Sequence, residues 1–259
     1  MIPTIGKNRL KNLTPAHVRN LYRSKSDSGL SPRTVQYIHV TLHKALKDAV
    51  LDGLIPRNVT DGVKAPKLEQ KEAQYLTQDQ ARKLLDTAHG DRLEALYVVA
   101  LHTGLREGEL LRLEWSDWRG DYLHVRGTKN KTSERAVKLS KTAQDALIGH
   151  RSRQNEERLA AATWEDTGLI LTTQAGKQID RHNLWRQFKR LLKRAELPDV
   201  PFHSLRHTCA TLLFHAGKDL MYVQNQFGHA SSKITRDTYT HHIQGNDGGL
   251  ADAMDDLLG

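Results

Sequence analysis

Residues 201–242 read PFHSLRHTCATLLFHAGKDLMYVQNQFGHASSKITRDTYTHH, and the rest of the sequence is interpreted outward from this stretch. His203 and Arg206 are three residues apart, so on a helix they share one face. His229 and Tyr239 follow further along. Imidazole and guanidinium groups can bind a phosphate, and a phenol can attack one. Singly these are ordinary side chains, but as an ordered set they predict a phosphate site.

Glycines divide this stretch into helical segments. Gly217 is a predicted helix stop, and residues 219–227 are a predicted second helix. Gly228 then supplies a tight turn, which places His229 at a helix end. The imidazole is therefore expected beside a helix terminus rather than along a helix face.

An upstream segment, TGLREGELLRL at residues 103–113, supplies another arginine. Arg106 follows the helix-ending Gly104, and Glu109 lies one turn away, where we expect it to hold local structure. Together these motifs resemble the tyrosine recombinases of the phage-integrase type. That family carries an Arg in a GLR-x-x-EL context, a Lys on a β-hairpin, an H-x-L-R-H box, an LGH box and a Tyr shortly after it. The corresponding catalytic residues here are Arg106, Lys129, His203, Arg206, His229 and Tyr239.

The resemblance implies a transesterification at a DNA phosphate. The phenol of Tyr239 would end covalently on a 3′-phosphate while the two arginines neutralise the transition state. Lys129 would protonate the leaving 5′-oxygen, His203 would accept or relay the tyrosine proton, and His229 would donate to a phosphate oxygen. Because the bond energy is conserved, no ATP, Mg²⁺ or other cofactor is implied.

Two assignments have alternatives. The family's T-K-x-K pattern favours Lys129 as the general acid, although Lys131 lies in the same loop. His203 and His207 have the i, i+4 spacing that can hold zinc on a helix, but there is no HExxH motif and Arg206 lies between them. We therefore predict no metal site.

Composition limits the class of protein. The chain has 259 residues and 38% hydrophobic content, enough for one large or two modest packed domains. No apolar run approaches the roughly 20 residues that span a bilayer, and Met1 opens no export leader. The single cysteine, Cys209, is predicted to be a small core residue. These features fit a cytoplasmic protein.

The positive charge is concentrated at one end. Residues 1–67 carry 12 Lys/Arg against 4 Asp/Glu, whereas residues 68–259 carry 27 against 26. A basic module beside a near-neutral one predicts that the first binds a polyanion, although a solvated basic surface is the simpler alternative. The polar residues 64–74 are predicted to be a linker, and the resemblance implies that two such domains close around duplex DNA.

The resemblance assigns residues 1–67 to a helical core-DNA-binding domain that begins without its first helix, and residues 68–259 to the catalytic domain. Two helices are predicted in the first, from Pro15 to about Ser26 and from Pro32 to Gly53. Cations off their apolar stripes, and the basic face of a helix predicted over residues 180–195, are candidates for DNA contact. The predicted DNA-binding residues are Arg33, Lys44, Lys47, Arg181 and Arg186.

The predicted fold class is mainly α with a small antiparallel β-sheet, that is, α+β. Period-2 patterns predict two strands joined by the loop that holds the candidate lysines, and a small hairpin near Gly176. Helical patterns account for most of the remainder. One expected helix begins at Thr77 and includes Leu85, others cover about 91–104, 106–113 and 140–162, and expected strands cover 122–126 and 135–139.

The chain ends in an acidic segment. Residues 247–259 contain four Asp and no Lys or Arg, with Leu250, Met254, Leu257 and Leu258 on one stripe. DNA would repel this segment, so it should face protein. In the family such a helix docks on a neighbouring protomer, which implies a homotetramer on DNA; self-packing or a disordered tail are the alternatives. DNA-bending accessory proteins are a further possible partner.

Three functions are compatible with these motifs. The leading hypothesis is a site-specific recombinase that cuts and rejoins double-stranded DNA through Tyr239 for integration or excision of a mobile element. A type IB topoisomerase would share the chemistry without a preferred sequence. An inactive, DNA-binding relic would bind a site but form no covalent adduct. The linker, the small size and the acidic terminal helix favour the recombinase over the topoisomerase. The intact Arg106, Arg206, His229 and Tyr239 argue against the relic.

Overall fold

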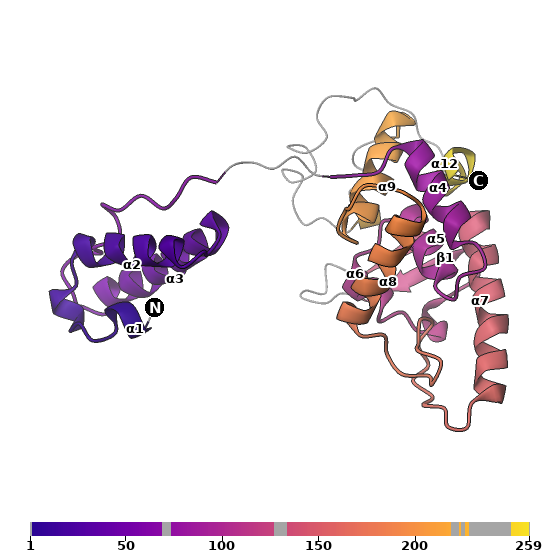
Figure 1. Ribbon diagram of the computed structural model, residues 1–259, viewed down its shortest axis with the longest axis horizontal. Helices are drawn as coiled ribbons and strands as arrows, with labels where there is room; N and C mark the ends of the chain where they lie inside the picture. Colours follow the sequence, from indigo (N-terminus) through magenta and orange to yellow (C-terminus); the bar gives the residue numbers. More distant parts are fainter. Residues whose placement is uncertain are drawn as a thin grey trace. The chain divides into compact units, whose positions relative to one another are not determined.

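The computed structural model describes residues 2–68, 74–126, 134–218, 223, 226–227 and 250–258. It divides into two compact units, Met1–Glu72 and Ala73–Gly259. The predicted boundary after residue 67 lies a few residues before this division, in the same polar stretch. The units are described separately below (Figure 1).

The N-terminal unit is a small helical bundle. Thr14 and Ser31 cap the two main helices, and each cap is followed by a proline at the first helical position, as the sequence predicted. The two helices pack through a separate small core that includes Val18, Leu21 and Leu46. The elements are α1 (Ile2–Ile5), η1 (Leu10–Asn12), α2 (Pro15–Asp27) and α3 (Pro32–Leu51).

The second unit is built around α5, which is buried on every side. All residues from Ala95 to Thr103 are buried, and a helix that is apolar all round belongs inside a core. Helices α4, α7 and α9 pack against it (Figure 1). The helices are α4 (Gln78–Ala88), α5 (Glu94–Thr103), α6 (Glu107–Leu110), η2 (Trp115–Asp117), α7 (Lys141–Ala160), α8 (Arg181–Arg194), α9 (Ser204–His215) and α12 (Leu250–Leu258).

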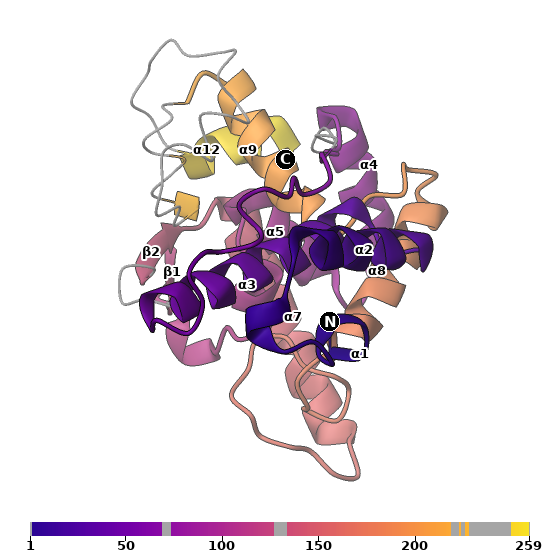
Figure 2. The same cartoon turned by 90° about the vertical axis from the view of Figure 1, so that its left-hand side faces the viewer.

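The predicted mainly helical fold with a small antiparallel sheet is confirmed. Strands β1 (Tyr122–Val125) and β2 (Arg135–Lys138) pair antiparallel, with Val125 opposite Arg135 (Figure 2). The small hairpin predicted around Gly176 is reduced to a single bridge between Thr172 and Gln178. The predicted helix over residues 106–113 is also shorter, because Arg106 is its N-cap and α6 has only four residues.

The C-terminal helix α12 packs against its own domain. Met254 is fully buried there, and α12 lies beside α9 (Figure 2). The Leu257 carbonyl accepts hydrogen bonds from Gln78 Nε2 at 2.9 Å and Arg82 Nε at 2.8 Å. In the structure of this single chain, α12 is therefore self-packed, which is one of the alternatives left by the sequence.

Asp255 of α12 caps the N-terminus of α7. Its carboxylate accepts from the backbone N–H of Lys141 at 2.8 Å and of Thr142 at 3.3 Å, the first groups of α7. A carboxylate is favourable at this helix end because the N–H groups there lack backbone partners. The buried His102, which pairs with Ser140 Oγ at 2.8 Å, lies 3.7 Å from the same carboxylate.

Among the described residues, no helix is long and apolar enough to cross a membrane.

Candidate active site

Arg106 is positioned by the end of the buried helix α5. Gly104 terminates that helix in the left-handed conformation, with φ of 64°. A Cβ at this position would come within 2.3 Å of the Phe227 ring, so the close approach as well as the backbone angle requires glycine. The chain therefore turns sharply, and Arg106 emerges as the N-cap of α6.

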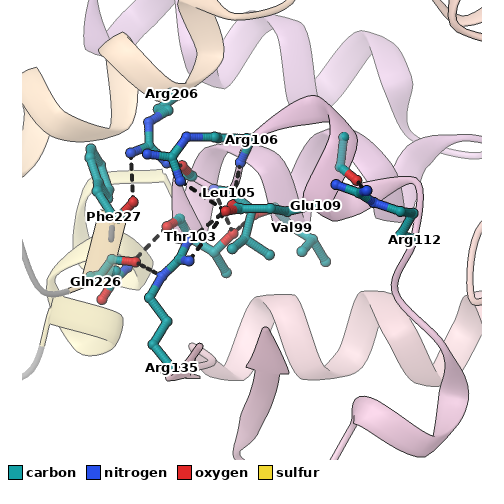
Figure 3. A network of polar contacts seen from close by, with 12 residues as sticks. Val99, Thr103, Leu105, Arg106, Glu109, Arg112, Arg135, Arg206, Gln226 and Phe227 are labelled. Carbon is teal, nitrogen blue, oxygen red and sulfur yellow. Dashed lines mark hydrogen bonds and ion pairs between the residues drawn. The ribbon is translucent and has the colours of Figure 1, made fainter. Parts of the chain in front are cut away.

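Glu109 holds Arg106 in place through hydrogen bonds, as the sequence predicted. Its carboxylate accepts from the Arg106 backbone N–H and from Arg106 Nη1, both at 2.9 Å. It also accepts from Arg135 Nη1 and Nη2, at 3.2 and 3.0 Å (Figure 3). The Glu109 side chain is only 3% exposed, and the two arginines keep its pKa below the usual value in spite of burial. It is therefore a permanent anion with a structural role.

Arg206 lies on the buried side of α9. Its Nη1 donates to the Gly104 carbonyl at 2.6 Å, and its Nη2 donates to the Phe227 carbonyl at 2.7 Å. The guanidinium also lies over the Phe227 ring, 4.5 Å from its centroid. Burial and the like charge of Arg106 lower its pKa from the usual value. Two fixed carbonyls thus set the plane of a largely desolvated cation.

The guanidinium groups of Arg106 and Arg206 lie close enough for the charge of Arg106 to lower the pKa of Arg206 (Figure 3). His203, one residue before α9, is close enough to both for their charges to matter. Desolvation, then the like charges of His207, Arg206 and Arg106, lower the pKa of His203 to about 4. His203 is therefore neutral at neutral pH. The structure thus brings together three of the six predicted catalytic residues.

The other three, Lys129, His229 and Tyr239, lie outside the described residues, as does the alternative Lys131. The described positions nearest to His229 in sequence are Gln226 and Phe227. Gln226 Nε2 donates to the Thr103 carbonyl at 3.3 Å, and the Phe227 carbonyl binds Arg206. The chain before His229 is therefore attached directly to the two-arginine site.

The predicted DNA-binding residues of the N-terminal unit are exposed on α3. Arg33, Lys44 and Lys47 project from the side of the helix opposite its buried stripe. The Arg33 guanidinium stacks on Tyr37, 5.1 Å from the ring centroid, and Tyr37 is itself 58% exposed. The buried stripe consists of Val35, Leu42, Leu46 and Ala49.

In the second unit, Arg181 and Arg186 are exposed on the first two turns of α8. Arg181 lies 3.5 Å from Glu107 of α6, next to the Arg106 cap. Arg186 contacts Asn183 and, with Arg92 and Arg190, lines a cleft of about 380 Å³. DNA contact by these residues stays a prediction.

The described residues offer no metal-ligand cluster. In the part of the chain that the structure covers, no three His, Cys, Asp or Glu side chains gather as metal ligands would. The rings of His203 and His207 instead meet edge to face, with centroids 4.9 Å apart. Cys209 is buried, and burial raises the pKa of its thiol to about 12, so it is an unreactive core residue.

Arg135 is a residue of this site that the motifs do not identify. The sequence predicts only a strand there, although alternation in RAVK places Arg135 on the same face as the buried Val137. An arginine on the buried face of a strand needs an internal partner, and Glu109 is that partner. The strand pattern could therefore have identified an internal charge, but not its partner.

Comparisons with known proteins identify the family. Residues 74–245 match the model of the phage integrase family. The chain belongs to the phage integrase family. It is a tyrosine recombinase, a site-specific enzyme that breaks and rejoins DNA strands, as the sequence predicted. The topoisomerase-like and inactive alternatives are not favoured.

Two relatives illustrate the match in sequence. A XerC-like tyrosine recombinase of Caldanaerobacter subterraneus subsp. tengcongensis is 30% identical, over 93% of this chain and 70% of that protein. The ICEBs1 integrase of Bacillus subtilis strain 168 is 28% identical, over 97% of this chain and 73% of that protein. The similarity therefore extends through both units of this recombinase.

Solved structures show the same fold. A lambda integrase dimer bound to a COC′ core site matches 95% of this chain and 70% of its own, with a TM-score of 0.73 and 21% identity. The Tn1549 transposon integrase in complex with a circular intermediate DNA matches 91% of this chain and 85% of its own, with a TM-score of 0.77 and 22% identity.

Proposed function

We propose that this recombinase cleaves DNA through a covalent 3′-phosphotyrosine at Tyr239. The phenol oxygen attacks the scissile phosphorus, and the bond to the 5′-oxygen breaks. Lys129 gives its proton to that oxygen, so a free 5′-hydroxyl leaves, and His203 takes the proton of the tyrosine. A 5′-hydroxyl from another strand then reverses the step. The phosphodiester energy is kept throughout, so no external cofactor enters.

The observation that carries the proposal is the pair of Arg106 and Arg206. Attack creates extra negative charge on the non-bridging oxygens, and fixed guanidinium forks stabilise it without reorganising. Each arginine is held by its own anchors, Glu109 for one and two backbone carbonyls for the other. His203 lies near both arginines and is the side chain that we assign as proton acceptor. His229 would complete the set as a donor to the phosphate.

The proposed substrate is double-stranded DNA with a specific attachment sequence. The net charge of residues 1–67 and the exposed face of α3 support DNA binding by the N-terminal unit. The integrases of ICEBs1 and Tn1549 among its relatives suggest that the DNA belongs to a mobile element. Arg181 and Arg186 would contact the backbone near the site.

Assembly is also a proposal. A lambda integrase tetramer bound to a Holliday junction is among the similar structures, which supports assembly of this chain on DNA as a tetramer. Helix α12 would then exchange its self-packed position for the same surface of a neighbour. Accessory DNA-bending proteins and a cytoplasmic location stay predictions from the sequence.

A covalent selection tests the function and identifies the target sequence in the same experiment. The full chain is incubated with duplexes that are randomised over one protomer's footprint and carry a nick just beyond the scissile position. The short fragment released by cleavage diffuses away, so the protein stays attached. After denaturation, protein-linked DNA is recovered and sequenced. We expect one enriched sequence, and no adduct with Tyr239→Phe.

Each other result has a defined meaning. An adduct that persists in Tyr239→Phe would refute the nucleophile. Recovery of DNA without sequence enrichment would indicate a type IB topoisomerase. Specific binding without any adduct would indicate an inactive relic.

A further inference from the structure

Arg135 is an internal charge that the proposed chemistry does not use. It opens β2, and its side chain is only 10% exposed. Its three nitrogens point to two different partners. Nη1 and Nη2 donate to Glu109, at 3.2 and 3.0 Å, and Nε donates to the Gln226 carbonyl at 2.6 Å (Figure 3).

The Glu109 carboxylate is shared equally by two arginines. A carboxylate has about four acceptor positions. Two accept from the backbone N–H and Nη1 of Arg106, and two accept from Arg135. The anion therefore cannot rotate toward Arg106 without giving up bonds to Arg135. This arrangement fixes the position of the Arg106 guanidinium.

Arg135 also joins three segments that are distant in sequence. Strand β2 comes a few residues after Lys129 in the chain, α6 begins at Arg106, and residues 226–227 precede His229. Gln226 in turn donates to the Thr103 carbonyl, at the end of α5. One guanidinium thus contacts both the carboxylate that holds Arg106 and the chain that leads to His229.

We infer that Arg135 is a positioning residue of this recombinase, which sets the Arg106 guanidinium through Glu109 and registers the β2 and 226–227 segments against it. The inference rests on the proposed Tyr239 chemistry. Arg135 itself does not touch the reacting phosphate. Because misplacement of a catalytic group by about 1 Å can slow a reaction about a hundredfold, the effect belongs to the cleavage rate rather than to DNA affinity.

The planar fork of arginine is essential to this role. A lysine at position 135 could keep one charged contact to Glu109, but its single ammonium cannot also reach the Gln226 carbonyl in the same geometry. The inference therefore predicts a graded series, with arginine fastest, lysine intermediate and methionine slowest. A purely structural role would lower stability without this order in the rate.

The test is the single-turnover rate of adduct formation by the full chain on the selected nicked duplex, at saturating protein. Arg135→Met is expected to lower this rate about 10- to 100-fold, and Arg135→Lys by less, while the dissociation constant for DNA changes less than about twofold. Arg126→Met is the control for loss of an ion-paired arginine next to the same hairpin. Arg126 directly follows β1 and donates to Glu114 and Asp117, which the proposed chemistry does not use.

The outcomes distinguish failure of the positioning role of Arg135 from failure of the proposed function. Cleavage by Arg135→Met at the unchanged rate, or an equal loss in Arg126→Met, would overturn the positioning role. If Arg135→Met does not fold, as thermal unfolding would show, Arg135→Lys decides: wild-type cleavage overturns the inference, and slowed cleavage with intact binding supports it. No adduct from the unchanged chain would overturn the proposed function and the inference with it.

Discussion

The two units of this recombinase use positive charge in opposite ways. On α3 of the N-terminal unit, Arg33, Lys44 and Lys47 stand in solvent. In the catalytic unit, Arg135 and Arg206 are almost fully buried, and both donate hydrogen bonds to protein carboxylate or carbonyl oxygens. Solvated cations supply affinity that depends on their number, whereas buried and anchored ones supply geometry.

This difference fits the uneven charge of the sequence if the N-terminal unit binds DNA, as we propose. Affinity for a polyanion grows with each added cation, and residues 1–67 carry nearly the whole excess. A catalytic pair needs position more than number. Buried cations also need anionic partners, and Glu109 is the partner of Arg106 and Arg135.

The largest effect should come from removing a catalytic guanidinium. Arg206→Ala or Arg106→Ala is expected to lower the cleavage rate at least about 10²- to 10³-fold, because a preorganised donor to the transition state is lost. DNA binding should be retained, since the solvated cations remain. Single-turnover cleavage and gel-shift titration measure the two quantities. Equal losses of DNA affinity and cleavage rate would contradict the distinction between cations that bind DNA and cations that catalyse.

The next effect tests the close packing beneath the arginines. Gly104→Ala adds a methyl group against Phe227 in a left-handed backbone, and we expect a loss of about 3 kcal/mol in unfolding free energy together with slower cleavage. Gly90→Ala is the matched control, because Gly90 has φ of +75° but open space around its Cβ position. Chemical denaturation compares them. Equal losses would show that packing on Phe227 contributes nothing.

The pH dependence of the unfolding free energy tests the buried His102 of the catalytic unit. Burial lowers the pKa of His102 to about 4 from 6.5, against a smaller opposing effect of Asp255. Between these values the unfolded chain binds a proton that the folded chain does not. The stability contribution is therefore complete above about pH 6.5 and is lost as pH falls toward 4, by about 2 kcal/mol at pH 5.

His102→Gln should show a shallower fall in unfolding free energy over that window, measured by urea denaturation at several pH values. The difference between variant and wild type isolates His102 from the other histidines with lowered pKa values. Parallel curves of unfolding free energy against pH for wild type and His102→Gln would contradict the assignment of this pH dependence to His102. In the part of the chain that the structure describes, those other histidines are His39, His150, His203 and His207.

The smallest effect concerns the solvated cations. Lys44→Ala and Lys47→Ala should each weaken DNA binding modestly and reduce the slope of log affinity against log salt by about 0.9, one phosphate contact each. Cleavage at saturating protein should not change. Lys83, which pairs with Glu196 on the catalytic unit, provides the control substitution to alanine. An unchanged slope would remove these residues from the DNA interface.

Much of this arrangement could be predicted from local sequence signals. The caps at Thr14, Ser31 and Thr77, and the stop at Gly104, depend on neighbouring residues, so the helices they bound could be predicted. Motifs predicted Arg106, His203 and Arg206 as one site, and in the structure their charges lie close enough to shift the pKa values of His203 and Arg206. The role of Glu109 followed from its spacing to Arg106.

What escaped prediction depends on contacts between distant segments. The pairing of Arg135 with Glu109 joins residues 26 apart, and its bond to the Gln226 carbonyl spans 91. Neither spacing has a periodicity that a sequence can display. The self-packing of α12 likewise depends on Gln78 and Arg82, far upstream, so the acidic stripe alone could not choose between protein partners.

The most direct test of the whole account is peptide mapping of the trapped protein–DNA adduct by mass spectrometry. After nuclease and protease digestion, the account predicts one modified peptide, with the nucleotide on the side-chain oxygen of Tyr239 through its 3′-phosphate. A nucleotide attached to any other residue, or linked through a 5′-phosphate, would contradict it.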